Sequence, residues 1–169
     1  YYKPPGARGQ GLHQDQQYIT IDPLIGAWVA LDDADAANGQ MVLVPGSNKG
    51  GLLPVETADM SVSFTGGQTK LAEGMKPIGI DMKAGDGLFF AGKTVHGSYP
   101  NKTTDRFRRS FICHYIGKHA TRFEPRKQAF GAGAKVVPAP FLRIAPGSRY
   151  QRHRHHGDIR RKPLHQLVS

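Results

Sequence analysis

The residues best suited to chemistry stand in two short motifs that are far apart in the chain. His13-Gln14-Asp15 lies near the start, and His96-Gly97-Ser98 lies well downstream. Two histidines and one carboxylate can hold a divalent metal such as Fe(II) and leave coordination positions open for a co-substrate and O2. Together the motifs predict a metal site with room for oxygen chemistry.

Each motif alone also has a plainer explanation. If residues 13–15 lie on a strand, His13 and Asp15 point to one face with their backbones roughly 6.5–7 Å apart, which suits a shared ion. A polar strand end has the same pattern. His96 comes after a turn and an apolar strand in residues 85–90. It could therefore be a ligand that reaches into a barrel or an ordinary buried histidine.

Arg108 and Ser110 are the candidate pair for binding a carboxylate. On the last predicted strand they share a face, and a guanidinium binds a carboxylate through two parallel hydrogen bonds. The alternative is a surface arginine in the basic run that ends at Arg109. Arg109 must point to the opposite face, and the two-residue period alone leaves open which face lines a site.

The elements that must position these residues are short strands. Apolar or alternating segments separated by turn signals such as Asn38-Gly39 indicate an all-β sandwich or barrel. Residues 50–75 are rich in Gly and Thr and are expected to form a loop or lid. Strands are predicted over residues 18–22, 26–31, 41–44, 77–82, 88–90 and 107–116.

Charge divides the chain into two parts. The 169 residues carry a net charge of +10, and residues 1–117 are balanced, so the excess lies in residues 118–169. We expect an irregular, solvated basic extension there. Nucleic-acid binding by Arg152, Arg154, Arg160 and Arg161 is not expected, because Tyr150 is the only aromatic residue close to them. A structural zinc site at His153, His155 and His156 is not expected either.

Composition also bears on location. The single cysteine, Cys113, excludes an internal disulfide and suits a reducing compartment, so a cytoplasmic location is expected. The sequence has no apolar run of about 18 residues, so no membrane span is expected.

The motifs together resemble the phytanoyl-CoA dioxygenase (PhyH-like) family of Fe(II)/2-oxoglutarate-dependent oxygenases. The resemblance covers about residues 7–117, in the order and spacing of the family. Its matching segments are residues 12–15, 28–33, 38–39, 44–47, 85–90, 96–98 and 106–114. Because only 12 residues precede His13, we expect residues 1–117 to be an oxygenase core that lacks part of the family's N-terminal region.

The resemblance implies a fold, a site and an activity. The fold would be mainly β, a jelly-roll or cupin-like double-stranded β-helix of eight core strands. Iron would be held by His13, Asp15 and His96, and the far carboxylate of the co-substrate 2-oxoglutarate would lie on Arg108, helped by Ser110. Gln14, Trp28 and Ser98 would contact the co-substrate or shape its pocket; Trp28 could equally be core packing.

The reaction implied by the resemblance is hydroxylation of an unactivated C–H bond by O2, with release of succinate and CO2. The substrate would be a small or lipid-like molecule, including an acyl-type substrate. Asp15 separates this chain from related halogenases, which have a small residue at that position. The competing hypothesis is a non-catalytic β-barrel that binds a metal or ligand.

Overall fold

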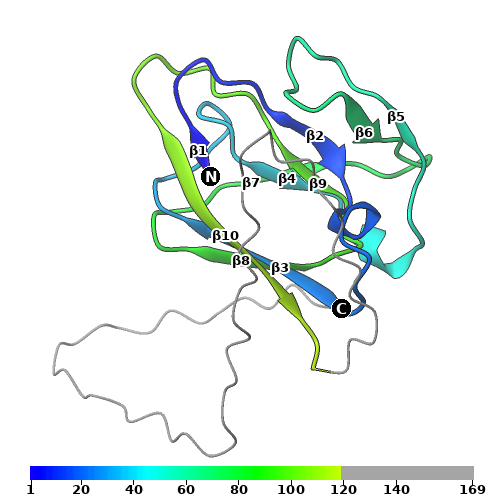
Figure 1. Ribbon diagram of the computed structural model, residues 1–169. Coiled ribbons are helices and arrows are strands. Elements are labelled where there is room, and N and C mark those ends of the chain that lie inside the picture. The colour runs from blue at the N-terminus through cyan, green and yellow to red at the C-terminus, as the bar shows by residue number, and fades with distance from the viewer. Residues whose placement is uncertain (119–169) are drawn as a thin grey trace, which may run out of the picture. The chain divides into compact units, whose positions relative to one another are not determined.

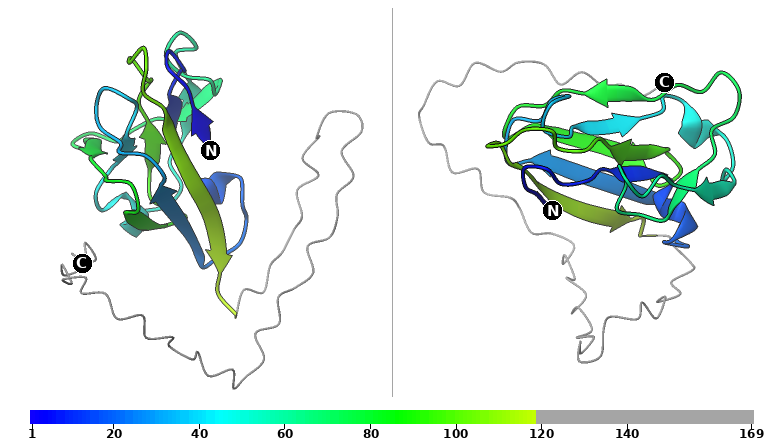
Figure 2. Two further views of the ribbon diagram at one scale, coloured as in Figure 1. Left: turned by 90° about the vertical axis from the view of Figure 1, so that its left-hand side faces the viewer. Right: turned by 90° about the horizontal axis from the view of Figure 1, so that it is seen from above.

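The computed structural model describes residues 1–118, which form two facing four-stranded antiparallel sheets (Figures 1 and 2). One sheet has the order β1 (Tyr2–Lys3), β10 (Arg108–Ile116), β3 (Leu24–Ala30), β8 (Gly87–Ala91). The other has the order β2 (Gln10–His13), β9 (His96–Ser98), β4 (Met41–Leu43), β7 (Ile78–Ile80). The predicted mainly-β fold of eight core strands is confirmed.

The core lies between the sheets and follows from the two-residue strand period. On β3, Leu24, Trp28 and Ala30 are buried and Ile25 is exposed, although Ala27, on the same face as Ile25, is also buried. Trp28 pairs with Leu88 of β8, and Phe90 lies opposite Gly26, where any Cβ would meet the Phe90 ring. The buried hydrophobic cluster consists of Trp28, Ala30, Ala34, Met41, Met82 and Phe90.

The turn before β4, at Asn38 and Gly39, is held by buried hydrogen bonds and by close backbone packing. Asn38 is fully buried, and its side-chain amide donates to the Asp33 carbonyl oxygen at 2.7 Å. Gly39 has a φ of +88°, which L side chains rarely adopt, and a Cβ there would come within 2.6 Å of the Tyr99 carbonyl oxygen. The Asn-Gly turn signal is therefore confirmed, with glycine required at its second position.

Two segments differ from the sequence prediction. The strand predicted over residues 18–22 is wrong: a short 3-10 helix, η1 (Asp15–Gln17), is followed by a turn, because the Asp15 carbonyl oxygen accepts from the backbone N–H groups of Tyr18 and Ile19. The predicted loop over residues 50–75 contains a two-stranded hairpin, β5 (Val55–Thr57) and β6 (Gly67–Thr69). A second 3-10 helix, η2 (Ser47–Lys49), precedes it.

The basic extension predicted over residues 118–169 lies outside the described residues apart from Lys118. Its proposed boundary, like the histidine cluster within it, therefore stays a prediction. Among the residues that the structure describes, no helix is long and apolar enough to cross a membrane.

Candidate metal centre

His13, Asp15 and His96 come together at one end of the second sheet. His13 is the last residue of β2, and His96 is the first residue of β9. The two histidines are direct register partners across the strand pair, and their ring centroids lie 4.2 Å apart. One ligand atom from each of the three buried residues lies within 4.8 Å of those of the other two.

Asp15 reaches this cluster by a different route from the one that the sequence suggested. The strand ends at His13, and Asp15 opens η1. Gln14 still has extended backbone angles, with φ −115° and ψ 122°, so the side chain of Asp15 projects to the same side as that of His13. The chain then continues as η1, and the Tyr18 ring that follows it is centred 6.3 Å from the His13 ring.

The backbone sets the orientation of both imidazoles. The Nδ1 atom of His13 lies 2.9 Å from the Gly11 carbonyl oxygen, and the Nδ1 atom of His96 lies 2.9 Å from the Thr94 carbonyl oxygen. A carbonyl oxygen only accepts, so each Nδ1 carries a proton, and in a neutral ring the lone pair is then on Nε2. Burial lowers the pKa of His96 to about 4, which favours the neutral form that binds metals.

The two oxygens of Asp15 have different partners. Oδ1 lies 3.5 Å from Nε2 of His13 and 3.6 Å from Nε2 of His96, so it faces the space between the two lone pairs. Oδ2 accepts a hydrogen bond of 2.9 Å from Nε2 of His114 on β10. Burial alone would raise the pKa of Asp15, but the bond from His114 and the nearby histidines hold it well below its usual range.

These donors fit a divalent metal ion. The Nε2 atoms of two imidazoles and one ionised carboxylate oxygen point into a common space, which is the donor set of non-heme Fe(II) sites. The side-chain amide of Gln10 lies 3.2 Å from Nε2 of His13 and must give up that nitrogen when a metal binds. The sequence did not identify His114 as part of this site, although the strand period places it on the same face as Arg108.

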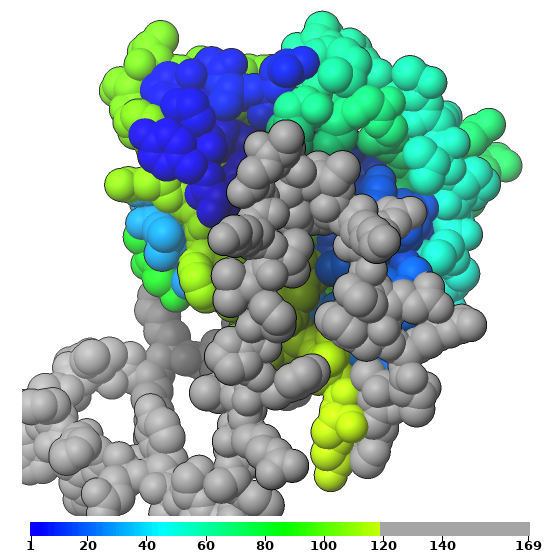
Figure 3. All heavy atoms as spheres, viewed as in Figure 1, coloured from blue at the N-terminus to red at the C-terminus, as the bar shows by residue number. Residues whose placement is uncertain are grey.

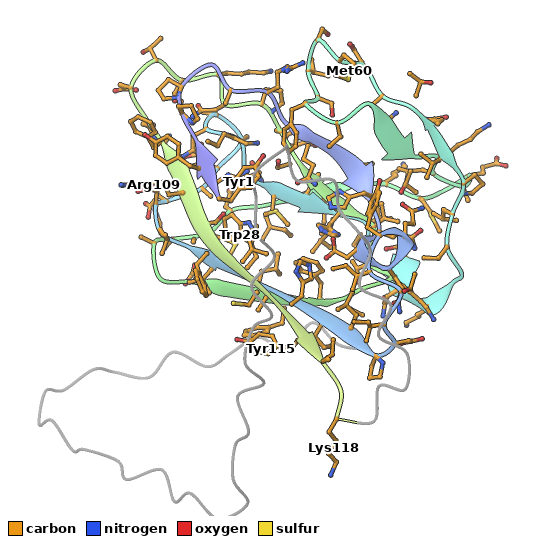
Figure 4. The ribbon with its side chains drawn as sticks, in the orientation of Figure 1. Tyr1, Trp28, Met60, Arg109, Tyr115 and Lys118 are labelled. Atoms are coloured by element: carbon orange, nitrogen blue, oxygen red, sulfur yellow. The ribbon has the colours of Figure 1, made fainter. Side chains whose placement is uncertain are left out.

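Arg108 lies inside the protein and not on its surface. It is 1% exposed, its Nε donates to the Gly39 carbonyl oxygen at 3.0 Å, and its Nη1 donates to Ser110 Oγ at 3.4 Å. Its guanidinium carbon lies 5.1 Å from the Tyr1 ring centroid and 5.4 Å from the Trp28 ring centroid. Figure 4 shows Tyr1 and Trp28 on the inner side of β10 and Arg109 on its outer side.

The remaining predicted site residues are all buried. The Gln14 amide donates to the carbonyl oxygens of Gly51 and Lys93 at 3.3 and 2.7 Å, and its oxygen accepts from Leu53 N–H at 2.8 Å. Gln14 thus anchors the start of the 50–75 segment, and its contact with a co-substrate stays a prediction. Trp28 belongs to the core and also borders Arg108.

Ser98 lies on β9, two residues after His96. Its Oγ accepts a bond of 2.9 Å from Nζ of Lys3 and one of 3.3 Å from the backbone N–H of Gln10. Its role toward a co-substrate also stays a prediction.

Comparison with known proteins points to one family. The profile of the phytanoyl-CoA dioxygenase (PhyH) family matches residues 1–110. A probable phytanoyl-CoA dioxygenase of Caenorhabditis elegans is 35% identical over 122 residues, which are 66% of this chain and 38% of that protein. The peroxisomal phytanoyl-CoA dioxygenase of Homo sapiens is 32% identical over 114 residues, 62% of this chain and 32% of that protein. The chain thus spans less than half the length of these relatives.

A solved structure agrees with the fold. The epimerase SnoN, crystallised with Fe3+, alpha ketoglutarate and nogalamycin RO, superposes with a TM-score of 0.61 at 25% identity. The match covers 80% of this chain and 56% of SnoN.

Proposed function

The chain belongs to the phytanoyl-CoA dioxygenase family, and we propose that residues 1–118 form the catalytic core of an Fe(II)/2-oxoglutarate-dependent oxygenase. The observation that carries this proposal is the convergence of His13, Asp15 and His96, with two imidazole lone pairs and one carboxylate oxygen facing a common space. The family match and the iron and alpha ketoglutarate in the SnoN crystal support the choice of metal and co-substrate.

The metal would be held by Nε2 of His13, Nε2 of His96 and Oδ1 of Asp15. Bound there with 2-oxoglutarate and O2, Fe(II) would supply the oxidation of a C–H bond. Because His114 occupies Oδ2, Asp15 would offer a single oxygen and leave coordination positions free. The Phe90 ring, centred 4.3 Å from that of His96, packs against the ligand and keeps water from one side of it.

Arg108 would bind the far carboxylate of 2-oxoglutarate, with the Ser110 hydroxyl beside it. The arginine is buried and is held by Gly39 and Ser110, so it is oriented before any ligand arrives. Within residues 1–118, Arg108 forms no ion pair with a carboxylate. A buried cation without an internal anion suits an anionic ligand.

The finer proposal is hydroxylation of a small or lipid-like substrate, with succinate and CO2 as the other products. Asp15 supports hydroxylation over halogenation because it supplies the third protein ligand. The relatives named as phytanoyl-CoA dioxygenases favour an acyl-type substrate.

The test is succinate formation by the full chain with Fe(II), 2-oxoglutarate and O2. Asp15→Ala should abolish it, whereas Asp33→Ala, which removes an exposed carboxylate paired with Lys83, should leave it unchanged. Succinate formation by Asp15→Ala at the wild-type rate would contradict the metal assignment. A folded, iron-loaded chain that forms no succinate would favour the competing binding-module hypothesis.

A further inference from the structure

Lys3 is a buried cation that the proposed chemistry does not yet use. It is the last residue of β1, its side chain is inside the protein, and the residue is 1% exposed. Nζ donates to Ser98 Oγ at 2.9 Å and also to the Tyr99 carbonyl oxygen. The lysine therefore reaches from the first sheet to β9 of the second sheet. No carboxylate of residues 1–118 forms a described ion pair with it.

A second buried cation lies directly opposite. The register pairs Lys3 with Arg108 across β1 and β10, and the two residues are equally buried. The blue N-terminal residues lie against β10 in the space-filling view (Figure 3). Directly paired strand positions are about 4.5–5.5 Å apart at their Cα atoms. Like charges placed in this way destabilise a sheet, and buried charges normally have a partner of opposite sign.

The pKa values of Lys3 and Arg108 agree with a place that binds an anion. Burial, reinforced by the charge of Arg108, lowers the pKa of Lys3 to about 7. Burial lowers the pKa of Arg108 to about 10. Both groups thus occupy a place that disfavours their charged forms until an anion enters.

The hydroxyl groups beside the two cations are also set for an anion. Ser98 Oγ accepts from Lys3 and Gln10, and Ser110 Oγ accepts from Arg108. Because each oxygen already accepts, each hydroxyl hydrogen is free to donate to a further acceptor. Two buried cations, each bonded to a hydroxyl group, thus belong to directly paired strand positions, which suits a carboxylate bound by both.

We propose that Lys3 is a second cationic contact for the far carboxylate of the co-substrate, so that Lys3 and Arg108 together select dicarboxylic over monocarboxylic 2-oxo acids. This inference rests on the proposed function. It adds a binding residue to the pocket and assigns the preference for a dicarboxylate to a pair of residues on β1 and β10.

The test compares two ligands and measures binding rather than turnover. The full chain, loaded with Mn(II), is titrated by calorimetry with 2-oxoglutarate and with 2-oxopentanoate, which lacks the far carboxylate. A hydrogen bond to a charged group corresponds to a change of roughly tenfold to 100-fold in affinity. Lys3→Met should weaken 2-oxoglutarate binding by that factor and leave 2-oxopentanoate binding within about twofold of wild type. Lys83→Met, at an exposed lysine, is the matched control and should change neither.

The outcomes separate the two proposals. Failure of the wild-type chain to bind 2-oxoglutarate with Mn(II) would refute the proposed function itself. If the wild type binds it but Lys3→Met weakens both ligands equally, or neither, Lys3 only fastens β1 to β9 and the inference is wrong.

Arg108→Met provides a second test that keeps Lys3 in place. That variant should retain a measurable preference for 2-oxoglutarate over 2-oxopentanoate, because one cation remains. Loss of all preference would overturn the inference even if Lys3→Met fails to fold.

Discussion

Replacing His114 with leucine should loosen the metal site without removing a ligand. In the structure, Nε2 of His114 donates to Oδ2 of Asp15 at 2.9 Å, while Oδ1 faces Nε2 of His13 and Nε2 of His96 at 3.5 and 3.6 Å. Without His114, the carboxylate loses the bond that decides which oxygen faces the metal. A hydrogen bond to a charged group contributes about 1.5–3 kcal/mol, and loss of a partner that orients a ligand typically lowers metal affinity about 10–100-fold.

The assay is titration of the full, metal-free chain with Mn(II), in which electron paramagnetic resonance reports the free ion. His114→Leu should weaken Mn(II) binding about 10–100-fold. His114→Gln, which keeps an N–H donor, should recover part of the loss. Tyr115→Leu is the matched control, because Tyr115 is the next residue on β10 and is exposed on the outer face. A His114→Leu affinity within twofold of wild type would refute the claim that His114 orients Asp15.

Three further predictions follow from single features of the structure. Lys3 has a pKa lowered to about 7, so between about pH 7 and its unfolded value near 10.5 the folded chain binds fewer protons than the unfolded chain. The free energy of unfolding of the ligand-free chain should therefore rise with pH across that window, and thermal melts of Lys3→Met should lack this rise. Gln14→Ala removes three hydrogen bonds to the Gly51–Leu53 and Lys93 backbone, so limited proteolysis should cut the 50–75 segment faster; an unchanged cleavage rate would contradict the anchoring role. Gly39→Ala adds a Cβ 2.6 Å from the Tyr99 carbonyl oxygen at a φ of +88°, and urea unfolding should show a loss of about 1–3 kcal/mol.

Residue types, together with the resemblance of the motifs to the family, were enough to predict much of the site. His13, Asp15 and His96 are the residues that the structure brings together, and the period of two placed Arg108 and Ser110 on one face. The backbone conformation at Asp15 could not be predicted in the same way. Asp15 begins the helix η1, which depends on backbone hydrogen bonds from Tyr18 and Ile19. Residues 18–22 alternate bulky and polar side chains, and this pattern wrongly predicts a strand.

The roles of Lys3 and His114 could not be predicted because they depend on strand pairing between residues far apart in the chain. Lys3 becomes buried only because β1, two residues long, pairs with β10 far along the chain. Likewise, His114 gains its importance from Asp15, on a different element. The β5–β6 hairpin was missed because its strands are three residues each within a stretch rich in glycine and threonine.

The way Gln14 holds the 50–75 segment has a consequence for protein engineering. Gln14 stands between two proposed metal ligands, yet every partner it has in this segment is a main-chain atom, of Gly51 or Leu53. An anchor that contacts only the backbone does not constrain which side chains the segment carries. Residues 51–53 can therefore change their side chains while this attachment is kept, whereas Ser63 and Thr65 are held through their side-chain oxygens, which accept from the backbone N–H of Gly11. Within residues 50–75, sequence changes are therefore tolerated best at positions 51–53.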